Sequence, residues 1–309
     1  VTTMSKASMK SVSRMVACCA GAAAFVVTLP LQAAGVDCGE TDKALAYWRP
    51  LREQAADAEV PVDSLAAELV SCLGSPNPEL RDRIGYELFT FWLRQDKLSG
   101  EARHSLLVQL RDNLSAEPTL LRSFSALILA ELMRSDAKEP FMNDEERNTL
   151  LSSAVEAIAA EKDFRGLEPD IGWVHPIAHM ADLLWRFALH PATDRGQSVT
   201  ILAAVGTKVA PVNVSYSFNE GDRLARVITT LIQRDLLDHQ VTADWISAFQ
   251  SPKSMDTWTD AFASPAGMAE LHNTKQFLRA LSDQIEGTDV DPLIAVPLAK
   301  LIAEFTGLI

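Results

Sequence analysis

The segment PNPELRDRIGYELFTFWLRQ (Pro76–Gln95) has the pattern of an amphipathic helix. Its prolines suit a first helical turn, where a backbone N–H group is not needed for an internal hydrogen bond. Apolar residues then recur at intervals of three and four and form one predicted inner stripe: Leu80, Ile84, Leu88, Phe91 and Trp92. This spacing predicts a helix that buries one face against its neighbours.

The same periodicity continues along most of the chain of 309 residues, which is 48% hydrophobic and 22% charged. From Thr41 onward it predicts about a dozen helices, in pairs that recur about every 40 residues, near the length of HEAT-type units. No repeat consensus is visible. We predict a single all-α domain over residues 35–309, a curved array of antiparallel helix pairs (a HEAT-like α-solenoid). Only Ala210–Phe218 resembles a strand, and Ser251–Gly267 is predicted as a long loop.

The first 34 residues have a different composition. Lys6, Lys10 and Arg14 precede an uncharged apolar run, Val16–Leu29, and small residues follow at Ala33 and Ala34. This order is typical of a secretory signal peptide, and the run is short for a membrane span. We therefore predict a signal peptide over residues 1–34, cleavage near Ala34 and an exported protein, periplasmic or secreted, with no stable membrane span afterwards. A retained signal anchor is the alternative.

Charge excludes some partners. The whole chain has a formal net charge of −13, and removing residues 1–34 leaves 25 basic and 41 acidic residues, a net charge of −16. Such a surface repels nucleic acid and anionic lipid. The mature part keeps two cysteines, Cys38 and Cys72, which would pair in an oxidising compartment or remain as two buried thiols.

The segment DIGWVHPIAHMADLLWR (Asp170–Arg186) contains the first candidate site. Pro176 suits the first turn of a helix and places His175 at its N-cap. On an ideal helix, His175, His179 and Asp182 fall within an arc of about 60°. Two imidazoles and a carboxylate are the ligands of many zinc and non-haem iron sites, so these three are the candidate metal ligands.

The alternative is an ordinary polar helix face. Ile177, Ala181, Leu184 and Ala188 would form the buried stripe, with the two histidines and Asp182 on the solvent side. Asp182 would then pair with Arg186 four residues later. Such a face explains every residue of the motif without a metal.

Two further clusters lie beside turns. The first is EKDFRG (Glu161–Gly166) and the second is FNEGDRLAR (Phe218–Arg226). If the turns of a helical stack gather along one edge, these clusters would share a concave patch with the histidines. The candidates for a general base are Glu161, Asp163 and Glu220, and those for ligand binding are Arg165, Trp173, Asp222 and Arg223. The alternatives are acids that complement a helix dipole and tryptophans of the core.

The strings EKDFRG, GWVHPIAHMADLLW and NEGDRLA, with RSFSALILAEL (Arg122–Leu132) upstream, resemble a bacterial family known as domain of unknown function 2785. The resemblance covers roughly Leu69 to Leu237, and its most specific part is Gly-Trp-x-His-x-x-x-His-x-x-Asp. It implies an all-helical fold and no assigned activity. The chain differs from the family pattern at Pro176 and Met180, where the family has small residues.

Three functions remain open from the sequence. The first is the binding of an unknown small molecule or protein in a groove lined by the histidines, Asp182 and the neighbouring acids. The second is a metal-dependent hydrolase, in which zinc or iron activates water. The third is a structural or protein-interaction scaffold. The chain has no Gly-x-Ser-x-Gly elbow, phosphate loop, dinucleotide fingerprint or Cys-x-x-Cys motif, so several common enzyme classes are not indicated.

Overall fold

The computed structural model describes residues 37–55 and 60–308, all within one compact unit, Gly35–Ile309. The predicted signal peptide and its cleavage site lie outside the described residues. The fold is all-α, as predicted. Its helices are α1 (Thr41–Glu53), α2 (Val62–Leu69), α3 (Glu87–Arg94), α4 (Gly100–Asp112), α5 (Thr119–Lys138), α6 (Asp144–Ala160), α7 (Pro176–Leu189), α8 (Arg195–Gly206), α9 (Glu220–Gln233), α10 (His239–Ser247), α11 (Pro265–Ile285) and α12 (Pro292–Gly307).

Shorter elements connect these helices. Four are 3-10 turns, η1 (Val70–Gly74), η3 (Asn113–Ser115), η4 (Ala248–Gln250) and η5 (Trp258–Ala263), and η2 (Glu79–Tyr86) is π-helical. The only strands of the described residues are β1 (Leu167–Glu168) and β2 (Gly172–Trp173), an antiparallel pair that joins Leu167 to Trp173 and Glu168 to Gly172. Residues 210–218 form no strand, and η5 interrupts the predicted loop 251–267.

The segment that begins at Pro76 forms η2 and α3. Leu80, Ile84, Leu88 and Trp92 are buried as predicted, but Phe91 is half-buried and Phe89 is fully buried. The π-helical winding of η2 adds residues to a turn and so shifts the phase of the apolar stripe away from a constant 3.6-residue period. Phe91 packs against the core at the edge of this stripe, whereas the full burial of Phe89 was not predicted.

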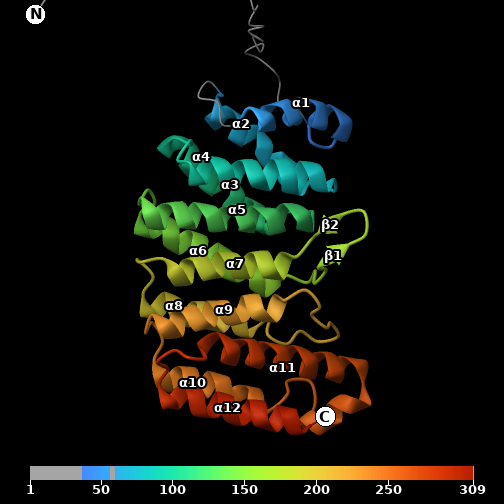
Figure 1. Cartoon of the computed structure of the whole chain (residues 1–309), viewed down its shortest axis with the longest axis vertical. Helices are drawn as coiled ribbons and strands as arrows, with labels where there is room; N and C mark the ends of the chain where they lie inside the picture. The colour runs from blue at the N-terminus through green and yellow to red at the C-terminus, as the bar shows by residue number, and fades with distance from the viewer. Residues whose placement is uncertain (1–36, 56–59, 309) are drawn as a thin grey trace, which may run out of the picture. The chain divides into compact units, whose positions relative to one another are not determined.

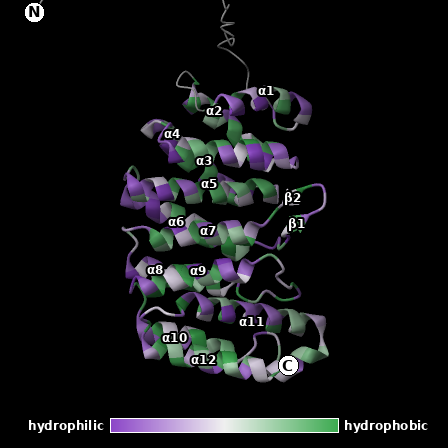
Figure 2. Ribbon diagram, in the orientation of Figure 1, coloured by the Kyte–Doolittle hydropathy of each residue, from purple (hydrophilic) through white to green (hydrophobic). Residues whose placement is uncertain are grey.

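Helices two positions apart in the sequence lie against each other in two rows (Figure 1). In one row α3 packs on α5, α5 on α7, α7 on α9, and α9 on α11. In the other, α2 packs on α4, α4 on α6, and α6 on α8, while α10 packs on α12. Hydrophobic and hydrophilic residues alternate around most helices (Figure 2), so each helix buries its apolar stripe against its neighbours.

Capping residues fix where several helices begin. Asn143 and Asp194 form capping boxes with Glu146 and Gln197 at the starts of α6 and α8.

At the N-terminal end of the described residues, a disulfide joins Cys38 to Cys72, which are 34 positions apart in the sequence. It connects the segment before α1 to η1. Of the alternatives open from the sequence, the structure has the paired cysteines. None of the described helices is long and apolar enough to cross a membrane.

Candidate functional site

Helix α7 is buried on nearly all sides, because it lies between α5 and α9 in the row. His175, His179 and Asp182 are 7%, 8% and 9% exposed. The interpretation of these residues as a solvent-facing polar stripe is therefore wrong. Asp182 also does not pair with Arg186; its partners are two arginines of α9.

His175 forms the N-cap of α7, and Pro176 occupies the first helical position, as the sequence predicted. The backbone of His175 is left-handed, with φ 46° and ψ 42°, a conformation that costs energy in a residue with a Cβ atom. Its ring stacks on Trp173, with 4.9 Å between the ring centroids. Trp173 is 40% exposed, so this tryptophan is not a core residue.

The imidazole of His175 donates through Nε2. This nitrogen lies 3.0 Å from the carbonyl oxygen of Phe218 and 3.2 Å from Oε1 of Glu220, and both oxygens are acceptors. Nε2 therefore carries a proton and is engaged as a donor. Burial acts to raise the pKa of Glu220, but hydrogen bonds from His175 and from the backbone N–H groups of Phe218 and Glu220 outweigh it and lower that pKa.

His179 has a different partner. Ser123 Oγ lies 2.5 Å from the carbonyl oxygen of Val174 and 2.8 Å from Nδ1 of His179. The hydroxyl has one proton, which it donates to Val174, so it accepts from Nδ1 and the lone pair of His179 is on Nε2. Burial and the nearby His175, together with two arginines, lower the pKa of His179 to about 3. The ring is therefore neutral at pH 7.

Asp182 is held by Arg223 and Arg226, one guanidinium on each carboxylate oxygen. Arg226 also stacks over Trp185, 4.1 Å from its ring centroid. Asp182 thus forms ion pairs with two cations at the contact between α7 and α9. We use the name histidine cluster for this set of residues: Ser123, Trp173, His175, His179, Asp182, Glu220, Arg223 and Arg226.

The three predicted metal ligands therefore have three different partners. Nε2 of His175 and Nδ1 of His179 are already engaged, so at most one nitrogen of each ring is left for a metal, and Asp182 is engaged by the arginines. Two nitrogens are fewer than the three protein ligands of a catalytic zinc site. Among the described residues, no three His, Cys, Asp or Glu side chains are arranged to hold a metal ion.

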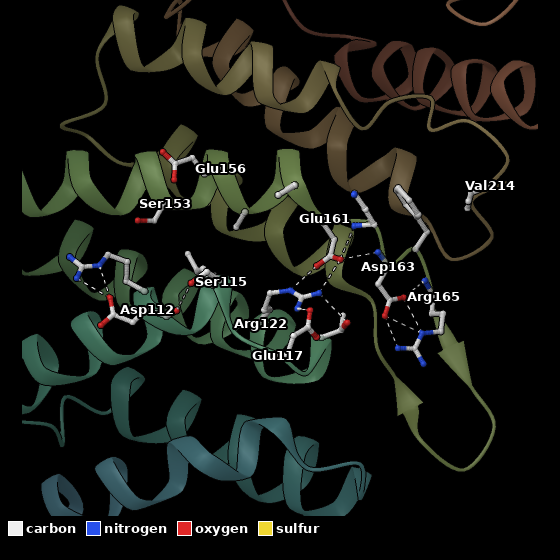
Figure 3. Close-up of a pocket in the computed structure, with 17 residues that line it drawn as sticks. Asp112, Ser115, Glu117, Arg122, Ser153, Glu156, Glu161, Asp163, Arg165 and Val214 are labelled. Carbon is white, nitrogen blue, oxygen red and sulfur yellow. Dashed lines mark hydrogen bonds and ion pairs between the residues drawn. The ribbon is translucent and has the colours of Figure 1, made fainter.

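The segment Glu161–Arg165 forms one wall of a groove. This groove has a volume of about 1140 Å³ and lies among α4, η3, α5, α6 and the segment that follows α6 (Figure 3). Its lining residues are Arg111, Asp112, Leu114, Ser115, Glu117, Thr119, Arg122, Ser153, Glu156, Ala157, Ala160, Glu161, Lys162, Asp163, Phe164, Arg165 and Val214. The histidine cluster contributes no residue to this lining.

A buried ion pair lies at the base of the groove. Arg122 Nε and Nη2 each donate to Glu161 over 3.2 Å, and the side chain of Glu161 is only 1% exposed. Arg122 also pairs with Glu117 at 2.8 Å, and Glu117 is on the exposed rim. Figure 3 shows Arg122 between the two glutamates. Glu161 additionally accepts from the backbone N–H groups of Lys162 and Asp163.

Asp163 and Arg165 form a second pair nearer the mouth of the groove. The Arg165 guanidinium contacts both carboxylate oxygens of Asp163, with the shortest distance 2.6 Å. Burial acts to raise the pKa of Asp163, but the hydrogen bonds from Arg165 outweigh it, so that pKa is lowered. Two predicted site residues are therefore joined here, whereas Asp222 is exposed on α9, where its carbonyl oxygen accepts from Gln284.

The groove wall and the histidine cluster are connected through the backbone. Val174 N donates to Gly166 O over 2.8 Å, and His175 N donates to Arg165 O over 3.1 Å. Gly166 also lies against Phe218, because a Cβ atom at this position would be 1.9 Å from the Phe218 ring. Through these contacts the cluster fixes the backbone of Arg165 in the groove wall and of Gly166, which follows it.

Sequence reasoning missed Arg122, Ser123 and Arg226 as site residues. Arg122 and Ser123 interrupt the apolar pattern at the start of α5, and both contact a predicted site residue. Arg226 lies three positions after Arg223, which places both on one helix face. A search for polar residues inside predicted apolar stripes would have found Ser123, which is fully buried.

The comparisons with known proteins give one match. The family described as "Protein of unknown function (DUF2785)" matches residues 112–282, which include the groove wall and the histidine cluster. This confirms the resemblance seen in the sequence, although the match begins later and extends further than expected. No curated protein and no solved structure matches the chain.

Proposed function

The chain belongs to the DUF2785 family, whose description assigns no activity. For this member of the family we propose the function of a binding protein for a small polar ligand. The proposed site is the groove described above. The observation that carries the proposal is the buried Arg122–Glu161 pair at its base, with the Asp163–Arg165 pair beside it. Ligand sites commonly combine a concave surface with a few fixed polar groups.

The chemistry of the lining indicates the kind of ligand. Four cations (Arg111, Arg122, Lys162 and Arg165) alternate with five acids (Asp112, Glu117, Glu156, Glu161 and Asp163), so positive and negative groups nearly balance. Such a surface offers hydrogen-bond donors and acceptors close together and no strong net charge. It suits a ligand with many hydroxyl groups, or a zwitterion, better than a metal ion or a simple anion.

The histidine cluster supports the groove in this proposal and does not contact the ligand. Its side-chain contacts fix Val174 and His175, whose N–H groups hold Gly166 and Arg165. Residues that position a binding wall need to be rigid, because a loose wall costs binding free energy when it becomes ordered. The left-handed backbone of His175 is maintained by these contacts.

Thermal melting with ligand panels tests the proposal. We would measure the melting temperature with neutral oligosaccharides, with dipeptides, and with sulfate and Zn²⁺ as charged contrasts. Neutral or zwitterionic compounds are expected to raise the melting temperature, because a ligand that binds only the folded state stabilises it. A shift with the oligosaccharides would indicate a ligand with many hydroxyl groups, and a shift with the dipeptides would indicate a zwitterion.

A pair of variants locates the binding. Asp163→Asn combined with Arg165→Gln should abolish the ligand-dependent shift. The control is Asp235→Asn with Arg195→Gln, which removes another exposed pair, 3.1 Å apart, that does not line the groove. Equal shifts in both variants, or shifts caused only by sulfate or Zn²⁺, would contradict the proposal.

We further propose that the two rows of helices form an α-solenoid and that the mature protein is exported. The packing of helices two positions apart supports the first, since each repeat of a solenoid contacts its neighbours. The Cys38–Cys72 disulfide supports the second, because disulfides persist in oxidising compartments. Fractionation of cells that express the full chain, with mass measurement of the product, tests export: a product that keeps residues 1–34 in the cytoplasm would contradict it.

A further inference from the structure

Another cavity lies among α8, α10, η4, η5 and α11, away from the groove. Its volume is about 280 Å³, and it shares no lining residue with the groove. Three aromatic side chains line it: Trp245, Phe249 and Trp258. Trp245 and Phe249 are in edge-to-face contact, with centroids 5.0 Å apart. The volume is near the lower end of the range for small-molecule sites, which begins at about 300 Å³.

A buried carboxylate also lines this cavity. Glu270 on α11 is 1% exposed and accepts from the backbone N–H groups of Lys253 and Ser254 and from the Ser254 hydroxyl. In the described part of the chain, no Lys, Arg or His side chain forms an ion pair with Glu270. Lys253 also lines the cavity, and its ammonium group donates to the carbonyl oxygen of Gly206 over 3.1 Å at an exposed position. Glu270 is thus held by hydrogen bonds, and Lys253, the cation among the lining residues, forms no ion pair with it.

One turn later on α11, Thr274 supplies an unused polar atom. It lines the cavity, is 1% exposed, and its Oγ1 has no hydrogen-bond partner among the described residues. A buried hydroxyl without a partner costs free energy, so a group that satisfies it would be favoured. The polar atom, the carboxylate and the aromatic rings belong to the same small enclosure.

We propose that this cavity binds a compact organic cation, of the size of a quaternary ammonium alcohol. Aromatic rings attract a cation through their quadrupoles, and the Glu270 carboxylate supplies the opposite charge. A ligand hydroxyl would satisfy Thr274. The site is independent of the proposed function of the groove, because its lining comes from other elements.

Isothermal titration with two molecules of nearly equal shape tests the proposal. Choline carries a trimethylammonium group, and 3,3-dimethylbutan-1-ol replaces that group by an uncharged tert-butyl group. We expect choline to bind with a Kd below about 1 mM and at least 10-fold more tightly than the alcohol, since only choline gains from the carboxylate and the rings. Absence of choline binding at 10-fold higher concentration (about 10 mM), or equal affinities, overturns the proposal.

Variants assign the binding to this cavity. Glu270→Gln should weaken choline binding at least 10-fold and leave the affinity for 3,3-dimethylbutan-1-ol unchanged. The matched control is Glu286→Gln, which removes an exposed carboxylate at the end of the same helix. If Glu270→Gln does not fold, as judged by circular dichroism, Trp245→Leu provides a second test, with an expected loss of at least five-fold in choline affinity. Unchanged choline affinity in the folded variant overturns the assignment.

Discussion

The neutral state of His179 predicts how stability changes with pH. The pKa of His179 is about 3 in the folded protein and about 6.5 in an unfolded chain. Protonation therefore favours the unfolded state as soon as the pH falls below about 6.5, and the folded state gains no compensation until the pH nears 3. The stability from this histidine is present above pH 6.5 and is lost progressively between pH 6.5 and 3.

The size of the effect follows from these two values. Between pH 7 and pH 5 the linkage relation gives a loss of about 2 kcal/mol from His179 alone. Asp136, whose pKa is lowered to about 2, titrates below this window and so contributes little to the change. The measurement is urea unfolding followed by far-UV circular dichroism at pH 7 and pH 5.

A substitution isolates the contribution of His179. Asparagine in its place keeps an N–H group near the position of Nδ1, which can donate to Ser123, but does not titrate. The His179→Asn variant should lose about 2 kcal/mol less than the wild type between pH 7 and pH 5. The reasoning is refuted if His179→Asn and the wild type lose the same free energy over this range.

Three further changes test other contacts. Gly166→Ala places a Cβ atom 1.9 Å from the Phe218 ring and should destabilise the fold by about 1–3 kcal/mol in thermal melting. Adding Phe218→Ala should remove the clash, so a double variant in which Gly166→Ala still costs the same free energy would contradict this reason. Cys38→Ser opens a disulfide that spans 34 positions, and urea unfolding should show a loss of about 3–4 kcal/mol; an unchanged midpoint would argue against the pairing. Asp182→Ala leaves two arginines without their shared anion and should cost about 1–3 kcal/mol in urea unfolding, whereas Asp222→Ala should leave stability nearly unchanged.

The helical class could be predicted from the sequence because periodicity depends only on which side of each helix is buried. The buried stripe of Leu80, Ile84 and Leu88 shows this. The burial of Phe89 could not be predicted, since π-helical winding changes the phase locally. The strand-like segment 210–218 was not expected to make a sheet, and it makes none: it has no neighbouring strand to bond with, and Asn273 satisfies part of its backbone.

The candidate site was predicted in composition and only partly in arrangement. Spacing correctly put His175 at the N-cap of α7. Spacing along one helix, however, carries no information about the partners that other helices supply. Ser123 from α5 and the two arginines from α9 determine what His179 and Asp182 do, and those contacts depend on the packing of three helices.

Packing between helices two positions apart has a consequence for how the chain can vary in length. The groove uses α4 to α6 and the segment after α6, whereas α12 contacts chiefly α10 and α11. Loss of α12 alone would therefore leave the groove's own contacts unchanged, whereas α11 holds Val214 of the lining through Asn273. Hydrogen exchange should accordingly be slowest in α5 and fastest in the outermost helices.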